Sequence, residues 1–298
     1  MKLKKLTLCI GAAAVIAGAA VVVWPASENT AGESVAAVEQ EENWVVQPMV
    51  ITPEEQAEAQ KKLAARGPVD FPVNDMLRAV SNGDKELVKL HIQAGTKLVY
   101  REEYENIVHY AVMSKDIEMT KLVLSIPGIR LHVHAPDIGE PIVLAAAENN
   151  KKAIKLILNH PDWKCPSAQL HAILTNDAAA LKAIIEKGEF KPAGAELWTS
   201  QMAAALGHKE CLELIVEAVK GNEDFGINEH GSYGPAIELA VRHGHVDCVK
   251  LLIAVPGINL NCECFWDDEA GKHITPLQYA ISQGKTEIAE ILRAAGAE

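Results

Sequence analysis

The stretch from Thr275 to Leu292 constrains the fold of this chain more than any other. It has the pattern of two short antiparallel helices. Thr275 can cap the first helix and Pro276 suits its first position, whereas Gly284 breaks the chain between the two. The apolar residues Ile288 and Leu292 fall on one face of the second helix. Neither helix is long enough to be stable alone, so each needs neighbours that cover its apolar side.

The same unit recurs upstream. Residues 240–252 repeat its layout, residues 203–215 form a third copy, and four looser copies precede them. Each copy has an alanine in its first helix, and successive alanines are 32, 35, 26, 31, 37 and 40 residues apart. Such a period predicts a solenoid, in which neighbouring units cover one another. The seven alanines are Ala79, Ala111, Ala146, Ala172, Ala203, Ala240 and Ala280.

These motifs resemble a known family. Residues 275–280, Thr-Pro-Leu-Gln-Tyr-Ala, match the T-P-L-H-x-A pattern of ankyrin repeats, with Gln278 in place of histidine. His109 keeps that histidine, while Gly207-His208 and Gly244-His245 resemble the turn between the paired helices. The chain therefore resembles an ankyrin-repeat protein.

The resemblance covers roughly residues 70 to 298 and implies an all-α solenoid of stacked helix-turn-helix units with finger loops. We place the repeat domain, with about seven repeats, at residues 69–298. The copy around Ala172 departs most from the pattern, because it has neither Thr-Pro nor a Gly-His turn. The short interval between Ala146 and Ala172 predicts a stunted finger, and so a notch in the strip of finger side chains that a curved solenoid aligns along one edge.

The N-terminus has the layout of an export signal. Three lysines among the first five residues precede an uncharged run from Leu6 to Trp24. That run is also just long enough to span a bilayer. We expect residues 1–31 to be a signal peptide or an N-terminal membrane anchor, held in the cytoplasmic membrane by residues 6–24. The repeats are then exported, and are periplasmic or secreted.

Residues 32–68 are predicted to be an acidic linker with a short helix. Residues 27–50 are small and acidic without a helical period, which is typical of a flexible tether. Thr52 and Pro53 then begin a helix that is expected to run to Arg66. We interpret this helix as a spacer or as a cap on the first repeat, with a partner-binding helix as the alternative.

Charge and cysteine usage narrow the class of protein. The net charge is −12, and removal of residues 1–31, with three lysines and one glutamate, leaves −14. Such a surface repels nucleic acid and anionic lipid, so we expect a protein partner, no nucleic acid, and membrane contact only through the N-terminal segment. Cys211 and Cys248 occupy equivalent positions on successive second helices, too far apart for a disulfide, and are expected to be small buried residues.

The fingers carry the functional signal. In the family that the chain resembles, partners bind the concave face formed by fingers and first helices. The last finger, Asn261 to Thr275, is lengthened and holds Phe265-Trp266 beside three consecutive acids. These aromatics are either binding anchors or a cover for the exposed end of the stack. The candidate partner-binding residues are Trp163, Phe190, Phe225, Tyr233, Arg242, His243, Phe265 and Trp266.

No catalytic motif is apparent, and we expect no cofactor. There is no G-x-S-x-G elbow, no H-E-x-x-H and no glycine-rich phosphate loop. The chain is therefore predicted to be a non-enzymatic interaction scaffold. The alternative is a metal-binding or thiol-redox activity of the finger from Cys262 to His273, although its C-x-C spacing is unusual for a metal site. His132 and His134 are a weaker metal candidate, because no third ligand is near in sequence.

Overall fold

The computed structural model describes residues 44–67, 72–98, 106–135, 138–191, 199–220, 227–228, 233–267 and 271–298. The predicted signal peptide or anchor, residues 1–31, lies outside the described residues. Within the described ranges the chain is helical apart from one short β-hairpin.

Seven helix pairs follow one another along the chain, as the repeating alanines predicted. All seven alanines are buried and at most 3% exposed, so small side chains do stand at the helix contacts. The pairs are α2 (Pro72–Ser81) with α3 (Lys85–Gln93), α4 (Ile107–Met113) with α5 (Ile117–Leu124), α6 (Pro141–Ala147) with α7 (Lys151–Leu158), α8 (Ala168–Leu174) with α9 (Ala178–Glu186), α10 (Thr199–Leu206) with α11 (Lys209–Ala218), α12 (Ala236–His243) with α13 (Val246–Ile253), and α14 (Pro276–Ser282) with α15 (Thr286–Ala294).

The turn within each pair has one left-handed residue directly before the cap of the second helix. Glycine fills this position in the first pair and in the last three pairs. Lys115, Asn149 and Asn176 fill it in the others, with φ of 55°, 52° and 57°. The central copies therefore keep the turn geometry without the Gly-His sequence, which explains why they look irregular in the sequence.

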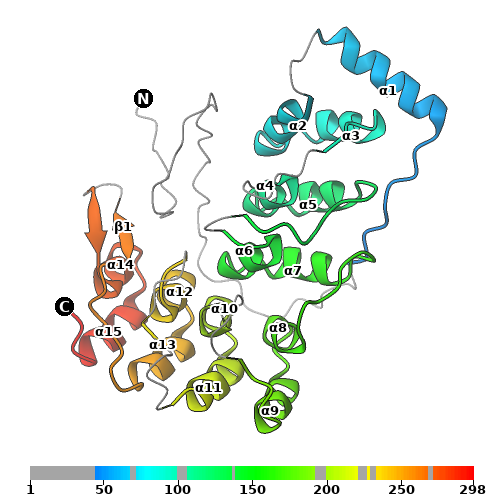
Figure 1. Cartoon of the computed structure of the whole chain (residues 1–298). Coiled ribbons are helices and arrows are strands. Elements are labelled where there is room, and N and C mark those ends of the chain that lie inside the picture. Colours follow the sequence, from blue (N-terminus) through cyan, green and yellow to red (C-terminus); the bar gives the residue numbers. More distant parts are fainter. Residues whose placement is uncertain are drawn as a thin grey trace, which may run out of the picture.

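The pairs stack into a hooked array with first helices inside and second helices outside (Figure 1). In the first three pairs, α4 packs on α2 and α6 packs on α4. In the last four, α10 packs on α8, α12 on α10 and α14 on α12. The second helices form matching rows, α3–α5–α7 and α9–α11–α13–α15.

The array is interrupted between the third and fourth pairs. Here α6 contacts α10 more extensively than it contacts α8, so the regular order of the first helices is interrupted at this point. The cause is the connector of residues 159–167, which is much shorter than the finger of residues 125–140 before it. The break lies in the short interval between Ala146 and Ala172, where the sequence predicts a stunted finger.

Helix α10 is the hub of this junction. All eight of its residues are buried, including the polar Thr199, Ser200 and Gln201. A helix buried on every side needs neighbours all round, and α10 has four of them in α6, α8, α11 and α12. In the sequence, the complete burial of this helix is reflected in the short apolar run Met202–Leu206.

The N-terminal part forms an outer strap with a helix. Helix α1 (Pro53–Ala65) begins at Pro53 with Thr52 as its cap, as predicted, and Thr52 and Glu55 form a capping box. It lies along α3 and buries Ala59. The prediction of a flexible tether through residue 50 is wrong for residues 44–50, because Val46 is buried and the Met49 amide donates to the Ser125 carbonyl at 2.7 Å.

The last finger is an antiparallel hairpin of β1 (Phe265–Asp267) and β2 (Lys272–Ile274). Phe265 pairs with Ile274, and Trp266 pairs with His273. The C-terminus fixes the base of this finger, because the Glu298 amide donates to Asn261 Oδ1 at 2.8 Å and Thr275 Oγ1 donates to the Glu298 carbonyl at 2.8 Å. The hairpin is thus held by both of its ends.

Candidate partner-binding face

The inner side of the array combines first helices with the fingers that precede them (Figure 1). Six of the eight candidate residues lie in fingers or connectors, and Arg242 and His243 end helix α12. Phe225 lies outside the described residues. The other seven divide into side chains that build the face and side chains that reach solvent.

Phe265 belongs to the first group. Its ring is 1% exposed and stacks on Tyr279 with centroids 4.0 Å apart and planes at 12°. Arg242 also lies over the ring, with its guanidinium carbon 5.9 Å from the ring centroid. Of the two alternatives for Phe265, an exposed anchor or a cover for the end of the stack, the buried ring, packed on Tyr279 and near Arg242, favours the cover.

Arg242 is also internal. Its guanidinium pairs with the carboxylate of Glu238, one turn earlier on α12. The Glu238 side chain is 2% exposed, whereas that of Arg242 is 27% exposed. Burial raises the pKa of Glu238 to about 7, and the charge of Arg242 opposes that rise. Arg242 thus orients the base of the hairpin and presents little surface to a partner.

Gly234 makes room for this carboxylate. A Cβ atom added there would lie 1.7 Å from Glu238 Oε2, and the glycine has φ of +88°. Any other residue would displace Glu238 from Arg242. The pair was missed in the sequence, although Glu238 and Arg242 stand at the i, i+4 spacing typical of helical ion pairs.

Tyr233 and His243 join α12 to the third repeat. Tyr233 is 7% exposed, and its hydroxyl donates to the Ile138 carbonyl at 2.7 Å. His243 Nε2 donates to the Ala147 carbonyl at 2.7 Å. Burial lowers the pKa of His243 to about 4, so the ring stays neutral near pH 7. The prediction that Tyr233 is an exposed partner contact is wrong, because its ring fills the junction between the sixth and third repeats.

The turn histidines act in a similar way between neighbouring repeats. His208 Nδ1 donates to the Ile173 carbonyl at 2.7 Å, and His245 Nε2 donates to the Ala205 carbonyl at 2.9 Å. Both carbonyls lie in the last turn of a first helix, where intrahelical donors are missing. His109 Nε2 bonds the Gly139 carbonyl at 2.9 Å. All three rings thus bond backbone carbonyls of a neighbouring part of the array.

Trp266, Trp163 and Phe190 keep part of their surface in solvent. Trp266 stands on the hairpin with its ring edge-on to His273, at a centroid distance of 5.1 Å. The ring of Trp163 stacks on that of His132 with their centroids 4.3 Å apart. Phe190, which follows α9, packs against the core. These three belong to separate fingers or connectors, and no pairwise contact among them is seen in the described residues.

The ligand types of the last finger do not form a metal cluster within the described residues. Asp268 lies outside them. Cys262 and Cys264 are free thiols, 5% and 7% exposed, beneath the hairpin. Cys211 and Cys248 are buried as predicted, and burial raises the pKa of both thiols to about 11. His132 and His134 are exposed on either side of buried Val133.

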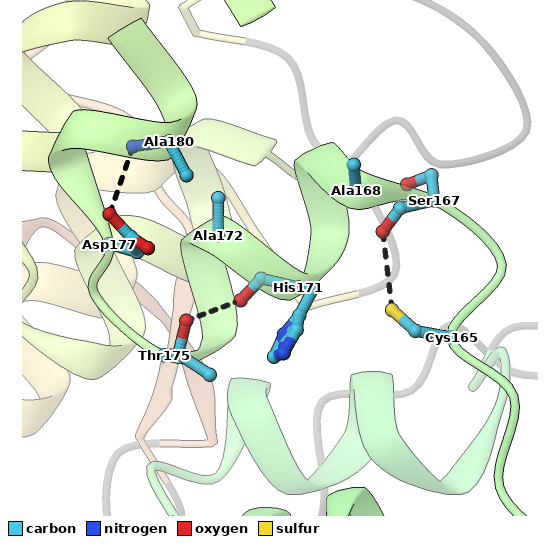
Figure 2. A pocket seen from close by; sticks show the side chains of 8 residues that line it. All are labelled: Cys165, Ser167, Ala168, His171, Ala172, Thr175, Asp177 and Ala180. Atoms are coloured by element: carbon cyan, nitrogen blue, oxygen red, sulfur yellow. Dashed lines mark hydrogen bonds between the residues drawn. The ribbon is translucent and has the colours of Figure 1, made fainter. Parts of the chain in front are cut away.

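A cavity of about 370 Å³ opens at the break in the array (Figure 2). Its walls come from one face of α8, the residues just before α8, and the start of α9. Alanine side chains form the apolar part of the wall, and hydroxyl, imidazole and carboxylate groups form its polar part. The lining residues are Cys165, Ser167, Ala168, His171, Ala172, Thr175, Asp177 and Ala180.

Among the helices of the described ranges, none has both the length and the apolar character to cross a bilayer. The predicted anchor, residues 6–24, lies outside those ranges.

Comparisons with known proteins identify the repeats. Residues 202–298 match the family model of ankyrin repeats, with three copies. None of the curated protein sequences matches the chain. Similar solved structures include the human ASB11 ankyrin repeat domain, with 19% identity, a TM-score of 0.35, and coverage of 75% of this chain and 84% of that one. An ankyrin repeat domain from Acinetobacter baumannii shares 22% identity, with a TM-score of 0.31 and coverage of 75% and 98%.

The assignment rests on the matched repeats and on the helix pairs. The matched segment spans the last three pairs, α10 to α15. The four pairs before it have the same order of first helix, left-handed turn and second helix, with a buried alanine in each first helix. Residues 202–298 are thus ankyrin repeats, and the described residues of the chain form an all-α solenoid of helix-turn-helix units.

Proposed function

We propose that this protein is a non-enzymatic scaffold that binds a protein partner through the inner face of fingers and first helices. Ankyrin repeats are generally protein–protein interaction modules, and that general role applies to this chain. The main support for binding through this face is the difference in exposure between two adjacent aromatic residues of the last finger. Phe265 is locked inside, whereas Trp266, the next residue, is held on a rigid hairpin with part of its ring in solvent.

A preorganised aromatic makes a strong anchor for a partner. Ordering a flexible side chain on binding costs free energy, and a ring already fixed by its neighbours avoids much of that cost. Trp266 is fixed by strand pairing with His273 and by the edge-on contact of their rings. Large aromatic residues are also over-represented among residues that dominate binding energy. The net charge of −12 favours a basic or neutral partner surface.

Site-specific photocrosslinking tests this proposal. A photoreactive phenylalanine analogue replaces Trp266 in one variant and Val50 in a control variant. Val50 is 91% exposed on the outer strap, away from the hairpin. Irradiation of cells is expected to give a covalent protein adduct from position 266 and none from position 50. Equal adducts from both positions, or an adduct from position 50 alone, would exclude the hairpin as the contact.

We also propose that the repeats act outside the cytoplasmic membrane, with residues 1–31 as the export signal or anchor. The support is the order of three lysines followed by the uncharged run from Leu6 to Trp24. A reporter that works only after export, fused after Glu298, is expected to be active. Activity of a cytoplasm-only reporter at the same position would contradict the proposal.

A further inference from the structure

The base of the last finger encloses a cluster of reactive groups. Cys262 and Cys264 stand just before β1, and both are buried free thiols. The Cys264 thiol is hydrogen-bonded to the Cys262 sulfur and also hydrogen-bonds the carboxylate of Glu238 on α12. That carboxylate pairs in turn with Arg242. Two thiols and a carboxylate are thus enclosed together, and the scaffold role uses none of them.

The arrangement of the two cysteines suits a reversible bond between them. In an extended segment, residues i and i+2 point to the same side of the backbone. Cys262 and Cys264 fit this pattern, because both are buried whereas Glu263 between them is exposed. A disulfide across a single intervening residue is strained, and strained disulfides have more oxidising potentials and are readily reduced. Such a bond is therefore suited to regulation and not to permanent support of the fold.

We propose that Cys262 and Cys264 form a redox switch, in which a low-molecular-weight disulfide oxidises the two thiols to a disulfide and thereby loosens the β1–β2 hairpin. The oxidised pair has no S–H group left to bond the Glu238 carboxylate, which is almost fully buried. Loss of a hydrogen bond to a buried charged group destabilises the structure around it. Cys264 directly precedes Phe265, the first residue of β1, so the change acts on the strand that also carries Trp266.

The order of the chemical steps follows from the surroundings of the two sulfurs. The hydrogen bond with Cys264 lowers the pKa of Cys262, whereas the same contact, burial and the charge of Glu238 raise the pKa of Cys264. The Cys262 thiolate therefore attacks one sulfur of the reagent, forms a mixed disulfide and releases one reagent thiolate. The Cys264 thiol gives its proton to the Glu238 carboxylate, and its thiolate attacks the Cys262 sulfur and displaces the second reagent thiolate. The two protein thiols lose two electrons and two protons, and the reagent is reduced to two thiols.

Access to these buried thiols comes from the position of the finger at the end of the array. The last repeat packs on the sixth, through α14 on α12 and α15 on α13. A terminal repeat opens locally at a lower free energy than an interior repeat, so a reagent reaches its thiols first. Cys211 and Cys248 serve as internal controls, because they are at most 1% exposed on the interior helices α11 and α13. Burial also raises the pKa of both control thiols to about 11.

Equilibration of the full chain with glutathione tests the formation of the disulfide. Purified, reduced protein is incubated at a series of ratios of oxidised to reduced glutathione, quenched with acid, alkylated and mapped by peptide mass spectrometry. The peptide that holds Cys262 and Cys264 is expected to lose two hydrogen atoms as the bridge forms, and dithiothreitol should restore both thiols. Cys211 and Cys248 are expected to react more slowly by a factor of about ten or more. Free thiols at both positions across the series, or glutathione adducts without a bridge, would overturn the proposal.

Hydrogen exchange and two variants test the order of the steps and the effect on the hairpin. Cys264→Ser keeps a donor near Glu238 and is expected to stop at the glutathione adduct on Cys262. Cys165→Ser, the matched control, removes a thiol of another connector and is expected to leave the bridge unchanged. In the oxidised native protein, β1 and β2 are expected to exchange faster than in the reduced protein, whereas α4 and α5 should not change. A bridged protein whose β1 and β2 exchange as before, or a Cys264→Ser variant without an adduct on Cys262, would contradict the switch.

Discussion

Replacement of Phe265 by alanine tests whether this residue stabilises the last finger, in contrast to Trp266, which is proposed to contact a partner. Phe265 is 1% exposed, and its ring stacks on Tyr279 at a centroid distance of 4.0 Å and lies near the guanidinium of Arg242. Truncation of a buried phenylalanine removes its transfer free energy and leaves a cavity, which together cost about 3–5 kcal/mol. The walls here are α12 and α14, which are held by other contacts, so the site collapses only partly.

In a solenoid, such a loss acts first on the repeat that contains it, because each repeat contacts mainly its neighbours. We therefore expect Phe265→Ala to unfold the hairpin with α14 and α15 at low urea, ahead of the rest of the chain. Circular dichroism gives the transitions, and hydrogen exchange locates the first one. Trp266→Ala, the matched control, is expected to change stability by less than about 1 kcal/mol, since its ring is partly in solvent. A change below about 1 kcal/mol for Phe265→Ala would refute this account of the finger.

Three other predictions concern the helix contacts, the turns and the buried histidines. Ala240→Asp places an unpaired charge at a fully buried contact of α12 and is expected to cost several kcal/mol in a urea melt. Gly284→Ala is expected to cost about 1–2 kcal/mol from backbone strain alone, because φ is +67° and an added Cβ would meet no atom within 4 Å. Burial lowers the pKa of His109 from 6.5 to about 4, so the unfolded chain binds more protons between these values. Stability should therefore fall by up to about 3 kcal/mol as the pH drops from 6.5 to 4, and His109→Gln should flatten that slope in urea melts.

The repeated unit was predictable because its signal is local. A small residue at each first helix, an apolar face on each second helix and a turn between them recur from Ala79 to Ala280. The start of α1 was predictable for the same reason, since its capping box involves only Thr52 to Glu55. These features depend on neighbours within a few residues.

The break between α6 and α8 depends on distant parts of the chain. The short interval around Ala172 indicated an irregular position, but the packing of α6 on α10 and the hydrogen bonds from Tyr233 and His243, 95 and 96 residues beyond their acceptors, join parts that are distant in the sequence. The strap of residues 44–50 has no period, so its packing on α5 and α7 left no pattern in the sequence.

The inner face was only partly predictable. Aromatic residues in fingers were the right places to look, but composition does not say which of two adjacent rings faces inward. Phe265 and Trp266 alternate across the hairpin, and the enclosed position was decided by Tyr279 and Arg242. Glu238 was missed, because a carboxylate in a buried first helix is tolerated only through Arg242 and the space at Gly234.

The most direct test of the scaffold is the affinity of the captured partner for three purified forms of the full chain. Isothermal titration would compare the native protein with Trp266→Ala and with Val50→Ala, whose side chain is 91% exposed on the outer strap. Loss of a true anchor costs on the order of 2 kcal/mol, or about a 30-fold rise in Kd. We expect that rise for Trp266→Ala, with an unchanged melting temperature, and no change for Val50→Ala. An unchanged Kd for Trp266→Ala together with a lowered melting temperature would contradict the account and make Trp266 a structural residue of the last repeat.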